Sequence, residues 1–272
     1  MNYLYSIIAG VVQGLTEFLP VSSSGHLILL HDWLGFNFVD NLGFDAILHW
    51  GTLFALLLYF RKEVVVYLKV FFSSFAHWNW QNDINQRVAW YILIATIPGA
   101  IFGYLFENDI ETIFRSPMLI AITLILAGLL LFVADKYFEK IKQLNEIKLG
   151  SAIIIGLAQA LALIPGVSRS AITIIAGLSQ KMKREAAAKF SFLLSMPIIF
   201  GAGLKKLIDL TDQQSLTSAE WWVLFFGFIS SFITGYFVIK YFLKFLQSHS
   251  FNVFVVYRLV LGFVILALIL IK

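Results

Sequence analysis

The sequence predicts an all-α polytopic membrane protein, with six transmembrane helices and two re-entrant helical hairpins arranged as an inverted-topology repeat. Composition is the first observation behind this prediction. Of the 272 residues, 60% are hydrophobic and only 13% are charged, whereas soluble domains contain about 45–50% apolar and about 25% charged residues. This apolar excess is too large for a single soluble core. The chain has no cysteine, which excludes disulfides, thiolate metal sites and cysteine nucleophiles.

The second observation is the recurrence of long apolar stretches. About 20 apolar residues are needed for a helix to cross the hydrocarbon core of a bilayer. Six stretches meet this requirement: Leu42–Phe60, Val88–Phe106, Pro117–Ala134, Ala186–Leu204, Trp221–Ile239 and Phe251–Ile271.

The third observation is that two further apolar regions are interrupted. Leu4–Leu34 is broken by Leu19–Gly25, and Leu149–Leu178 is broken by Ile164–Ser170. Each half is too short to cross a bilayer, and each break contains polar groups. Irregular backbone at membrane depth is tolerated only where protein buries it or where it lines a wet cavity. We therefore expect two re-entrant hairpins whose tips meet inside the bilayer.

The basic residues predict the orientation. If the first hairpin enters from outside, 14 of the 20 Lys and Arg residues fall in four inner loops, Arg61–Arg87, Lys136–Lys148, Lys181–Lys189 and Lys240–Asn252. Four fall outside, and Arg169 and Arg258 lie within apolar segments. This asymmetry is typical of the positive-inside rule, and it places both termini outside. The positions of the basic residues thus account for the net charge of +4 without a nucleic-acid partner.

An internal repeat is expected within a single membrane domain, 1–272, with halves of about 1–135 and 136–272. Each half has one hairpin and three spans, and because three is odd the second half must be inverted. The spacing from Gln13 to Ser22 equals that from Gln159 to Ser168. Inverted repeats with broken helices are common in transporters, so the architecture alone leaves transport open.

The first break contains a candidate acid–base group. Gln13 and Glu17 are four residues apart and share one helix face. A carboxylate in an apolar helix is costly and usually marks a functional cavity. Ser23 and His26 are three residues apart, and a serine needs an adjacent base to act as a nucleophile. Either a catalytic pair or an ordinary helix cap explains the serines here.

The second break contains a candidate anion site. Gly166 interrupts the helix, and Ser168 and Ser170 open a new one, whose free N–H groups favour anions. Arg169 adds a planar, permanently charged fork that matches phosphate oxygens. A structural Arg169–Glu17 ion pair is the alternative explanation. Together, the two breaks offer an acid–base group, a nucleophile and a phosphate clamp, which favours phosphoryl chemistry.

These two segments resemble a known family. Residues 13–26, QGLTEFLPVSSSGH, are similar to a (Glu/Gln)-xxx-Glu motif with a Ser-Ser-x-Gly-His extension. Residues 165–173, PGVSRSAIT, are similar to a Pro-Gly-x-Ser-Arg-Ser-x-x-Thr motif. Both motifs are those of the undecaprenyl-diphosphatases, the bacitracin-resistance family of bacterial inner membranes. The resemblance covers essentially the whole chain. It implies hydrolysis of the C55 lipid diphosphate to the monophosphate, which recycles the lipid carrier for cell-wall polymers.

The resemblance also implies residue roles. The catalytic set that it predicts is Glu17, Ser23, His26 and Arg169. The substrate-binding set is Gln13, Ser22, Ser24, Gly166, Ser168, Ser170 and Thr173. Whether Ser23 or His26 attacks phosphorus stays open. Gln13 stands where some relatives have Glu, so it can orient Glu17 or a phosphate oxygen but cannot act as an acid or base.

The expected cofactor is a divalent cation, Mg²⁺ or alternatively Ca²⁺. Glu17 is the expected protein ligand, Asp45 is a remote candidate, and most ligands would come from the diphosphate and water. The expected partners are the C55 lipid diphosphate and membrane lipids, without nucleic acid, and a homodimer is compatible with the sequence. We expect the bacterial plasma (inner) membrane, with a site that opens to the outer side because Ser22, Ser23 and Ser24 form the more hydrophilic break.

Two polar features outside the breaks have no assigned role. Asp45 and His49 lie one turn apart, and either line the same cavity or pair with each other. Arg258 lies within the last span, where snorkelling or a structural pair is expected. A polyprenyl-phosphate flippase remains the alternative function. An acid-phosphatase-like lipid phosphatase is disfavoured, because the one histidine after Arg169 is His249, in an inner loop.

Overall fold

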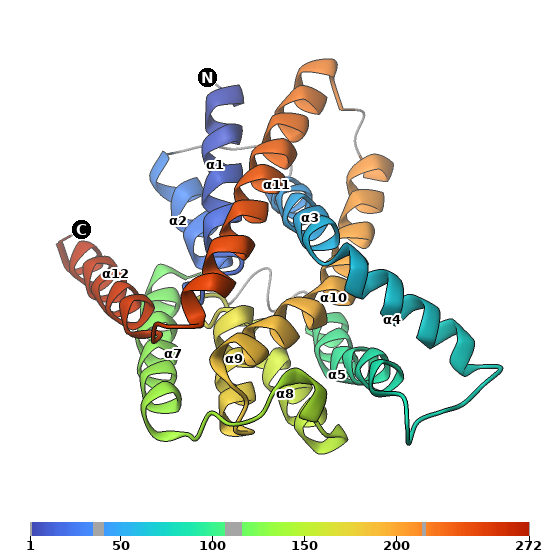
Figure 1. Ribbon diagram of the computed structural model, residues 1–272. Helices are drawn as coiled ribbons and strands as arrows, with labels where there is room; N and C mark the ends of the chain where they lie inside the picture. The colour runs from blue at the N-terminus through green and yellow to red at the C-terminus, as the bar shows by residue number, and fades with distance from the viewer. Residues whose placement is uncertain (1, 35–40, 107–115, 214–215, 272) are drawn as a thin grey trace.

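The computed structural model describes residues 2–34, 41–106, 116–213 and 216–271. Over these residues the secondary structure is helical and contains no strand beyond an isolated bridge between Lys142 and Met182. The described helices are α1 (Asn2–Thr16), α2 (Ser23–Leu34), α3 (Asn41–Tyr59), α4 (Arg61–Ser74), α5 (Ile84–Leu105), α7 (Pro117–Tyr137), the 3-10 turn η1 (Leu144–Glu146), α8 (Leu149–Leu161), α9 (Arg169–Ser179), α10 (Arg184–Gln213), α11 (Ser218–Leu246) and α12 (Asn252–Ile271) (Figure 1).

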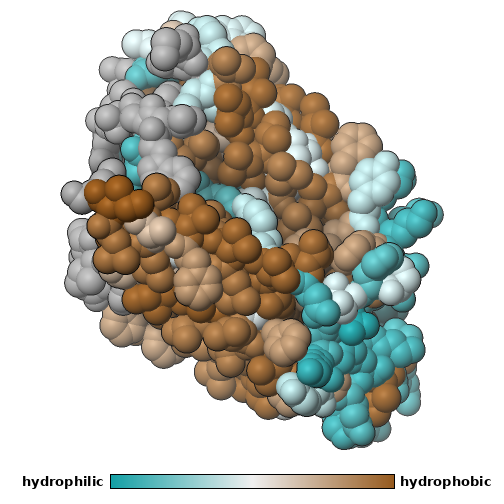
Figure 2. Space-filling view, turned by 90° about the vertical axis from the view of Figure 1, so that its left-hand side faces the viewer, coloured by the Kyte–Doolittle hydropathy of each residue, from teal (hydrophilic) through white to brown (hydrophobic). Residues whose placement is uncertain are grey.

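Six of these helices are long and apolar enough to cross a membrane: α3, α5, α7, α10, α11 and α12. Each of the six predicted spans falls on one of them, so this part of the prediction is confirmed. Apolar side chains cover most of the face shown in Figure 2, and hydrophilic side chains gather at its lower right. The chain is therefore a multi-pass membrane protein.

The helix ends differ from the predicted spans where local capping decides them. Helix α5 begins at Ile84, before the predicted Val88, because the Asp83 carboxylate accepts the backbone N–H groups of Asn85 at 2.9 Å and Gln86 at 3.1 Å. Such a cap satisfies donors that the first helical turn leaves free. Hydropathy cannot detect it, because the residues involved are polar.

The segment Arg61–Arg87 is expected from its sequence to be a loop, and for its first half this expectation is wrong. Arg61–Ser74 forms α4, and Glu63 in its first turn pairs with Lys189 of α10 at 3.0 Å. Its apolar residues Val65 and Leu68 are exposed. Residues 61–74 contain several β-branched residues and scattered charges, which obscure the apolar periodicity of a helix. The sequence therefore does not predict α4.

The two interrupted regions form pairs of short helices, α1 with α2 and α8 with α9. They have 15, 12, 13 and 11 residues, respectively. At a rise of about 1.5 Å per residue, each is shorter than the roughly 30 Å hydrocarbon core. The predicted breaks are therefore confirmed as breaks between helices.

The helix pairs pack across the two halves of the chain. Helix α1 packs mainly on α11, and α8 packs mainly on α5, while α3 packs on α10 and α7 on α12. Figure 1 shows α1 and α2 above, and α8 and α9 below. A Cβ atom on Gly14 would overlap Thr234 and Gly235 of α11, and one on Gly156 would overlap Ala95 of α5. Small residues therefore permit both close crossings.

Candidate active site

The turn between α1 and α2 presents the first group of polar residues. Ser22 precedes α2 with a φ of 76°, a left-handed conformation that is uncommon for a residue other than glycine. Its side-chain oxygen accepts the N–H of Gly25 at 3.3 Å, as an N-cap does. The turn thus ends with Ser23 as the first residue of a new helix.

The segment between α8 and α9 has the same local geometry. Ser168 precedes α9 with a φ of 74° and accepts the N–H of Ala171 at 3.2 Å. Its hydroxyl is 3.0 Å from that of Ser170, as the hydroxyl of Ser22 is 3.4 Å from that of Ser24. The helix then begins with Arg169, so each break places a residue of the predicted catalytic set directly after a left-handed serine.

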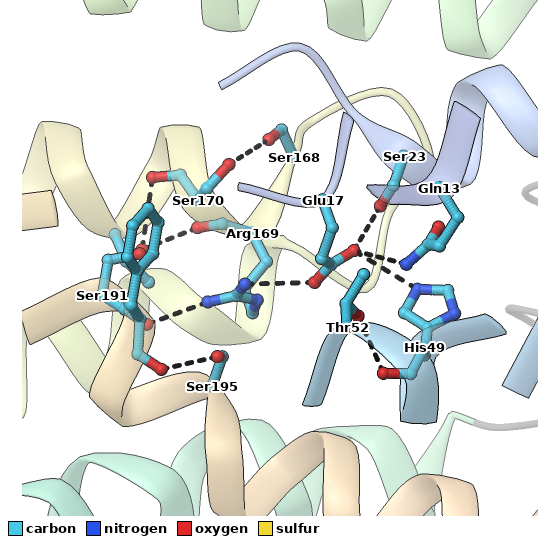
Figure 3. Close-up of polar contacts among 12 residues, drawn as sticks. Gln13, Glu17, Ser23, His49, Thr52, Ser168, Arg169, Ser170, Ser191 and Ser195 are labelled. Atoms are coloured by element: carbon cyan, nitrogen blue, oxygen red, sulfur yellow. Dashed lines mark hydrogen bonds and ion pairs between the residues drawn. The ribbon is translucent and has the colours of Figure 1, made fainter. Parts of the chain in front are cut away.

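The Glu17 carboxylate lies at the junction of the two breaks (Figure 3). Its Oε2 accepts hydrogen bonds from Gln13 Nε2 at 3.0 Å and from Ser23 Oγ at 2.6 Å. Its Oε1 accepts one from a guanidinium nitrogen of Arg169 at 3.1 Å, across 152 residues of sequence. His49 Nε2 lies 3.5 Å from Oε2. The expected proximity of Gln13, Glu17, Ser23 and Arg169 is therefore found.

Arg169 is held from two sides. One terminal nitrogen bonds Glu17, and the other donates to the backbone carbonyl of Ser191 on α10 at 2.9 Å. Its Nε is buried and has no hydrogen-bond partner. An unsatisfied buried donor on a permanent cation is costly, so a hydrogen-bond acceptor at this nitrogen would stabilise the site.

The remaining polar groups of the second break bond the protein itself. Ser170 Oγ donates to the Leu19 carbonyl in the first break at 3.0 Å. Thr173 Oγ1 donates to the Arg169 carbonyl at 2.7 Å and lies 2.7 Å from the Ser191 hydroxyl. Gly166 has a φ of 90°, and a Cβ there would overlap Thr123. These residues of the predicted substrate-binding set hold the site together in this structure.

His26 does not make the contact that its spacing to Ser23 suggests. Its Nδ1 lies 2.7 Å from the Ser22 carbonyl, and its Nε2 lies 2.7 Å from the Tyr257 hydroxyl. Since a carbonyl only accepts, Nδ1 carries a proton, and in the neutral ring the Tyr257 hydroxyl donates to Nε2. A Ser23–His26 hydrogen bond is therefore not formed, and the predicted catalytic role of His26 stays a prediction.

Arg258 of α12 is fully buried, so the expected snorkelling is wrong. It also has no carboxylate partner among the described residues. Instead, its guanidinium donates to five backbone carbonyls, at 2.8–3.4 Å, belonging to Pro20, Thr123, Leu124, Gly166 and Val167. These include both breaks, so one buried arginine fixes the two turns relative to each other. Because every residue has a backbone carbonyl, these partners of Arg258 cannot be recognised from the sequence.

Asp45 and His49 both line a cavity beside the breaks. The Asp45 carboxylate contacts His31 Nε2 at 2.9 Å, while His49 Nδ1 donates to the Asp45 backbone carbonyl at 2.7 Å. The cavity has a volume of about 370 Å³ and is mainly apolar. Its polar wall is formed by Ser24, Asp45, His49, Gln159, Arg169 and Lys206. Of the two alternatives for Asp45 and His49, the shared cavity wall is therefore the one found.

The match to known proteins covers both breaks and Arg258. A family model described as bacitracin resistance protein BacA matches residues 6–264. The chain belongs to this family.

Relatives in the BacA family are similar to this chain along its whole length. A protein of Desulforudis audaxviator named undecaprenyl-diphosphatase is 43% identical over 272 residues, which is 100% of both chains. A protein of the same name from Moorella thermoacetica is 45% identical over 268 residues, and one from Alteromonas mediterranea is 44% identical over 270 residues, each covering 98% of both chains.

The described part of this BacA-family chain contains no group of three or more His, Asp or Glu side chains placed to hold a metal ion. Both Glu17 oxygens already accept hydrogen bonds, and Arg169 lies beside them. A cation next to a guanidinium would be repelled. Glu17 therefore fits poorly as a direct ligand of a divalent cation.

Proposed function

We propose that this protein hydrolyses undecaprenyl diphosphate to undecaprenyl phosphate and inorganic phosphate. One observation carries the proposal: the Glu17 carboxylate joins the Ser23 hydroxyl, at 2.6 Å, to Arg169, at 3.1 Å. A hydroxyl, a base and a permanent cation in contact make a reacting set rather than a binding set. Membership of the BacA family, with relatives named undecaprenyl-diphosphatase, supports the substrate.

The geometry favours Ser23 as the attacking group. Its Oγ forms a bond to the terminal phosphorus and gives its proton to Glu17, while the bond from that phosphorus to the bridging oxygen breaks and undecaprenyl phosphate leaves. The departing undecaprenyl phosphate takes that proton from Glu17, which becomes a carboxylate again. Water then attacks the phosphorus of the phosphoserine and gives a proton to Glu17, while the bond from phosphorus to Ser23 Oγ breaks and Glu17 passes this proton to Ser23 Oγ. Inorganic phosphate is released. Arg169 stabilises charge on the phosphate oxygens in both steps.

His26 contributes by holding the first break. Its Nδ1–H bonds the carbonyl of Ser22, directly before Ser23, and Tyr257 holds its other nitrogen. A hydroxyl that attacks phosphorus must be positioned closely, because small displacements slow such reactions strongly. We therefore assign His26 to positioning Ser23.

A divalent cation, Mg²⁺ or alternatively Ca²⁺, remains part of the proposal as a companion of the substrate. Bound by diphosphate oxygens and water, it would neutralise part of the substrate's charge. Since Glu17 is occupied, we assign no side chain as its ligand. Activity that falls with a chelator and returns with Mg²⁺ supports this part of the proposal, whereas full activity in chelator contradicts it.

We further propose that the two short helix pairs are re-entrant hairpins in an inverted repeat. Three similarities between the halves of the chain support this. Ser22 and Ser168 are both left-handed, and each follows a glutamine, Gln13 or Gln159, at the same spacing. The first helix of each pair also packs on a helix of the other half, α1 on α11 and α8 on α5. Gln13 Oε1 and Gln159 Oε1 are both buried without a partner, which adds a fourth.

The orientation that we propose places the cavity on the outer side of the bacterial plasma membrane. The cavity is lined by the first turns of α3 and by Lys206 near the end of α10, which are outer ends if the basic loops lie inside. A Ser24→Cys variant in intact spheroplasts should react with a membrane-impermeant thiol reagent. Labelling only in inverted vesicles would reverse the orientation.

Hydrolysis by purified protein in detergent tests the main proposal. The wild-type protein should release inorganic phosphate from undecaprenyl diphosphate, and Glu17→Gln should not. Because inverted repeats also occur in carriers, flipping of the lipid across liposomes without hydrolysis would instead identify a transporter.

A further inference from the structure

His49 lies outside both breaks, yet it contacts the central carboxylate. It is on α3, and its Nε2 is 3.5 Å from Glu17 Oε2 (Figure 3). Its Nδ1–H donates to the Asp45 carbonyl at 2.7 Å. With one nitrogen committed as a donor and the other facing a carboxylate, the ring is fully satisfied only when both nitrogens carry protons. In that form His49 presents an Nε2–H toward Glu17.

The cavity makes His49 accessible to a ligand. His49 and Arg169 line the same 370 Å³ space, whereas His26 is not part of its wall. The side chain of His49 is 28% exposed, compared with 5% for Glu17. Both nitrogens of His26 are engaged by Ser22 and Tyr257. His49 is therefore the histidine that an anion in this cavity would meet.

Charge balance also favours a second cationic group in this wall. Arg169 and Glu17 form an ion pair at 3.1 Å, so their charges cancel and the pair alone offers no net attraction for a diphosphate. The Asp45 carboxylate, which lies in the same wall, contacts His31. Lys206 and His49 are the further basic residues of the wall. Of these two, His49 contacts the reacting set directly.

We propose that His49 binds the terminal phosphate of the substrate, its Nε2–H turning from Glu17 to a phosphate oxygen, so that α3 and α9 hold the phosphate between His49 and Arg169. This inference rests on the proposed hydrolysis. The exchange releases Oε2 of Glu17 from one of its three donors, which leaves it more available to take the proton of Ser23.

Binding of a non-hydrolysable analogue tests this contact. The probe is the methylene-bridged diphosphonate of farnesol, titrated by thermophoresis against purified protein in detergent. His49→Ala should weaken its affinity about 10- to 100-fold, as expected for one hydrogen bond to a charged group. His49→Gln should recover part of the loss, because the glutamine amide donates from nearly the same position as Nε2. His77→Gln, an exposed histidine of the inner loop, should match the wild type.

Turnover and stability separate this inference from its alternatives. A normal analogue affinity in a folded His49→Ala protein overturns the contact, even if kcat falls, because that result means His49 acts only through Glu17. Thermal unfolding of each variant shows whether it is folded. If the wild-type protein does not hydrolyse the lipid diphosphate, the proposed function fails. If it does and His49→Ala retains its kcat and KM, only the role of His49 fails.

Discussion

The phenol ring of Tyr257 stacks on the imidazole of His26, with ring centroids 5.7 Å apart and planes inclined by 9°. The Tyr257 hydroxyl also lies 2.7 Å from His26 Nε2. The two residues are 231 positions apart in the chain, so the last helix supports the first break. This support can be removed without touching the site itself.

Tyr257→Phe should lower kcat and leave KM nearly unchanged. The phenylalanine ring preserves the stack, but His26 Nε2 loses a hydrogen-bond partner, and the net contribution of one such bond is about 0.5–1.5 kcal/mol. Phosphate-release kinetics measure the effect. If the two residues act as a unit, adding Tyr257→Phe to His26→Ala should cost little more than His26→Ala alone. Additive losses would show that Tyr257 acts elsewhere.

Glu17→Gln should reduce turnover roughly 10²- to 10⁴-fold, because it removes the base but keeps the shape of the side chain. The double variant with Ser23→Ala should have about the same turnover as the slower of the two single variants, because the effects of two residues that act in one proton-transfer step do not add. The matched control is Glu63→Gln, which breaks the partly exposed pair with Lys189. A Glu17→Gln enzyme with normal kcat would remove Glu17 from the chemistry.

Arg169→Ala should lower kcat by roughly 10²- to 10³-fold, the typical cost of losing a preorganised donor to developing charge. Arg169→Lys should restore only part of this, because an ammonium cannot reproduce two contacts of a planar fork. Arg61→Lys at the exposed start of α4 serves as the control. Equal activity of the lysine and arginine proteins would show that charge alone is needed at this position.

Arg258→Met should destabilise the protein by several kcal/mol, because carbonyls in both breaks lose their buried donor. The stability of Arg258→Lys should lie between those of the wild type and Arg258→Met, since an ammonium reaches fewer of the five carbonyls. Thermal unfolding in detergent measures the change, with Lys240→Met as the exposed control. An unfolding temperature equal to that of the wild type would mean that the breaks are held by other contacts.

Much of the fold follows from the sequence because hydropathy acts over whole helices. The six spans and both breaks are visible as apolar runs and their interruptions, and the Glu17–Arg169 pair follows from the cost of leaving either charge alone. The ends of α5 and the existence of α4 depend on caps and single packing contacts, which the hydropathy pattern does not record.

The site was predicted less completely, because several of its contacts join distant residues or use the backbone. Nothing near His26 in the sequence indicates Tyr257. Arg258 bonds only carbonyls among the described residues, which every residue type supplies. His49 had two equal interpretations, because a histidine on an apolar helix is compatible with both a cavity wall and a local pair.

The position of Arg258 near the end of the chain sets an order of events during synthesis. All residues of both breaks precede it, so a growing chain contains the complete reacting set well before α12 leaves the ribosome. Until then Pro20, Gly166 and Val167 lack the guanidinium that joins them, and His26 lacks Tyr257. Chains begin to fold from the N-terminus as they emerge, but the contacts that join the two breaks through Arg258 can form only after the final helix is in place. The first break and the second break are thus locked together by the last part of the chain to be made.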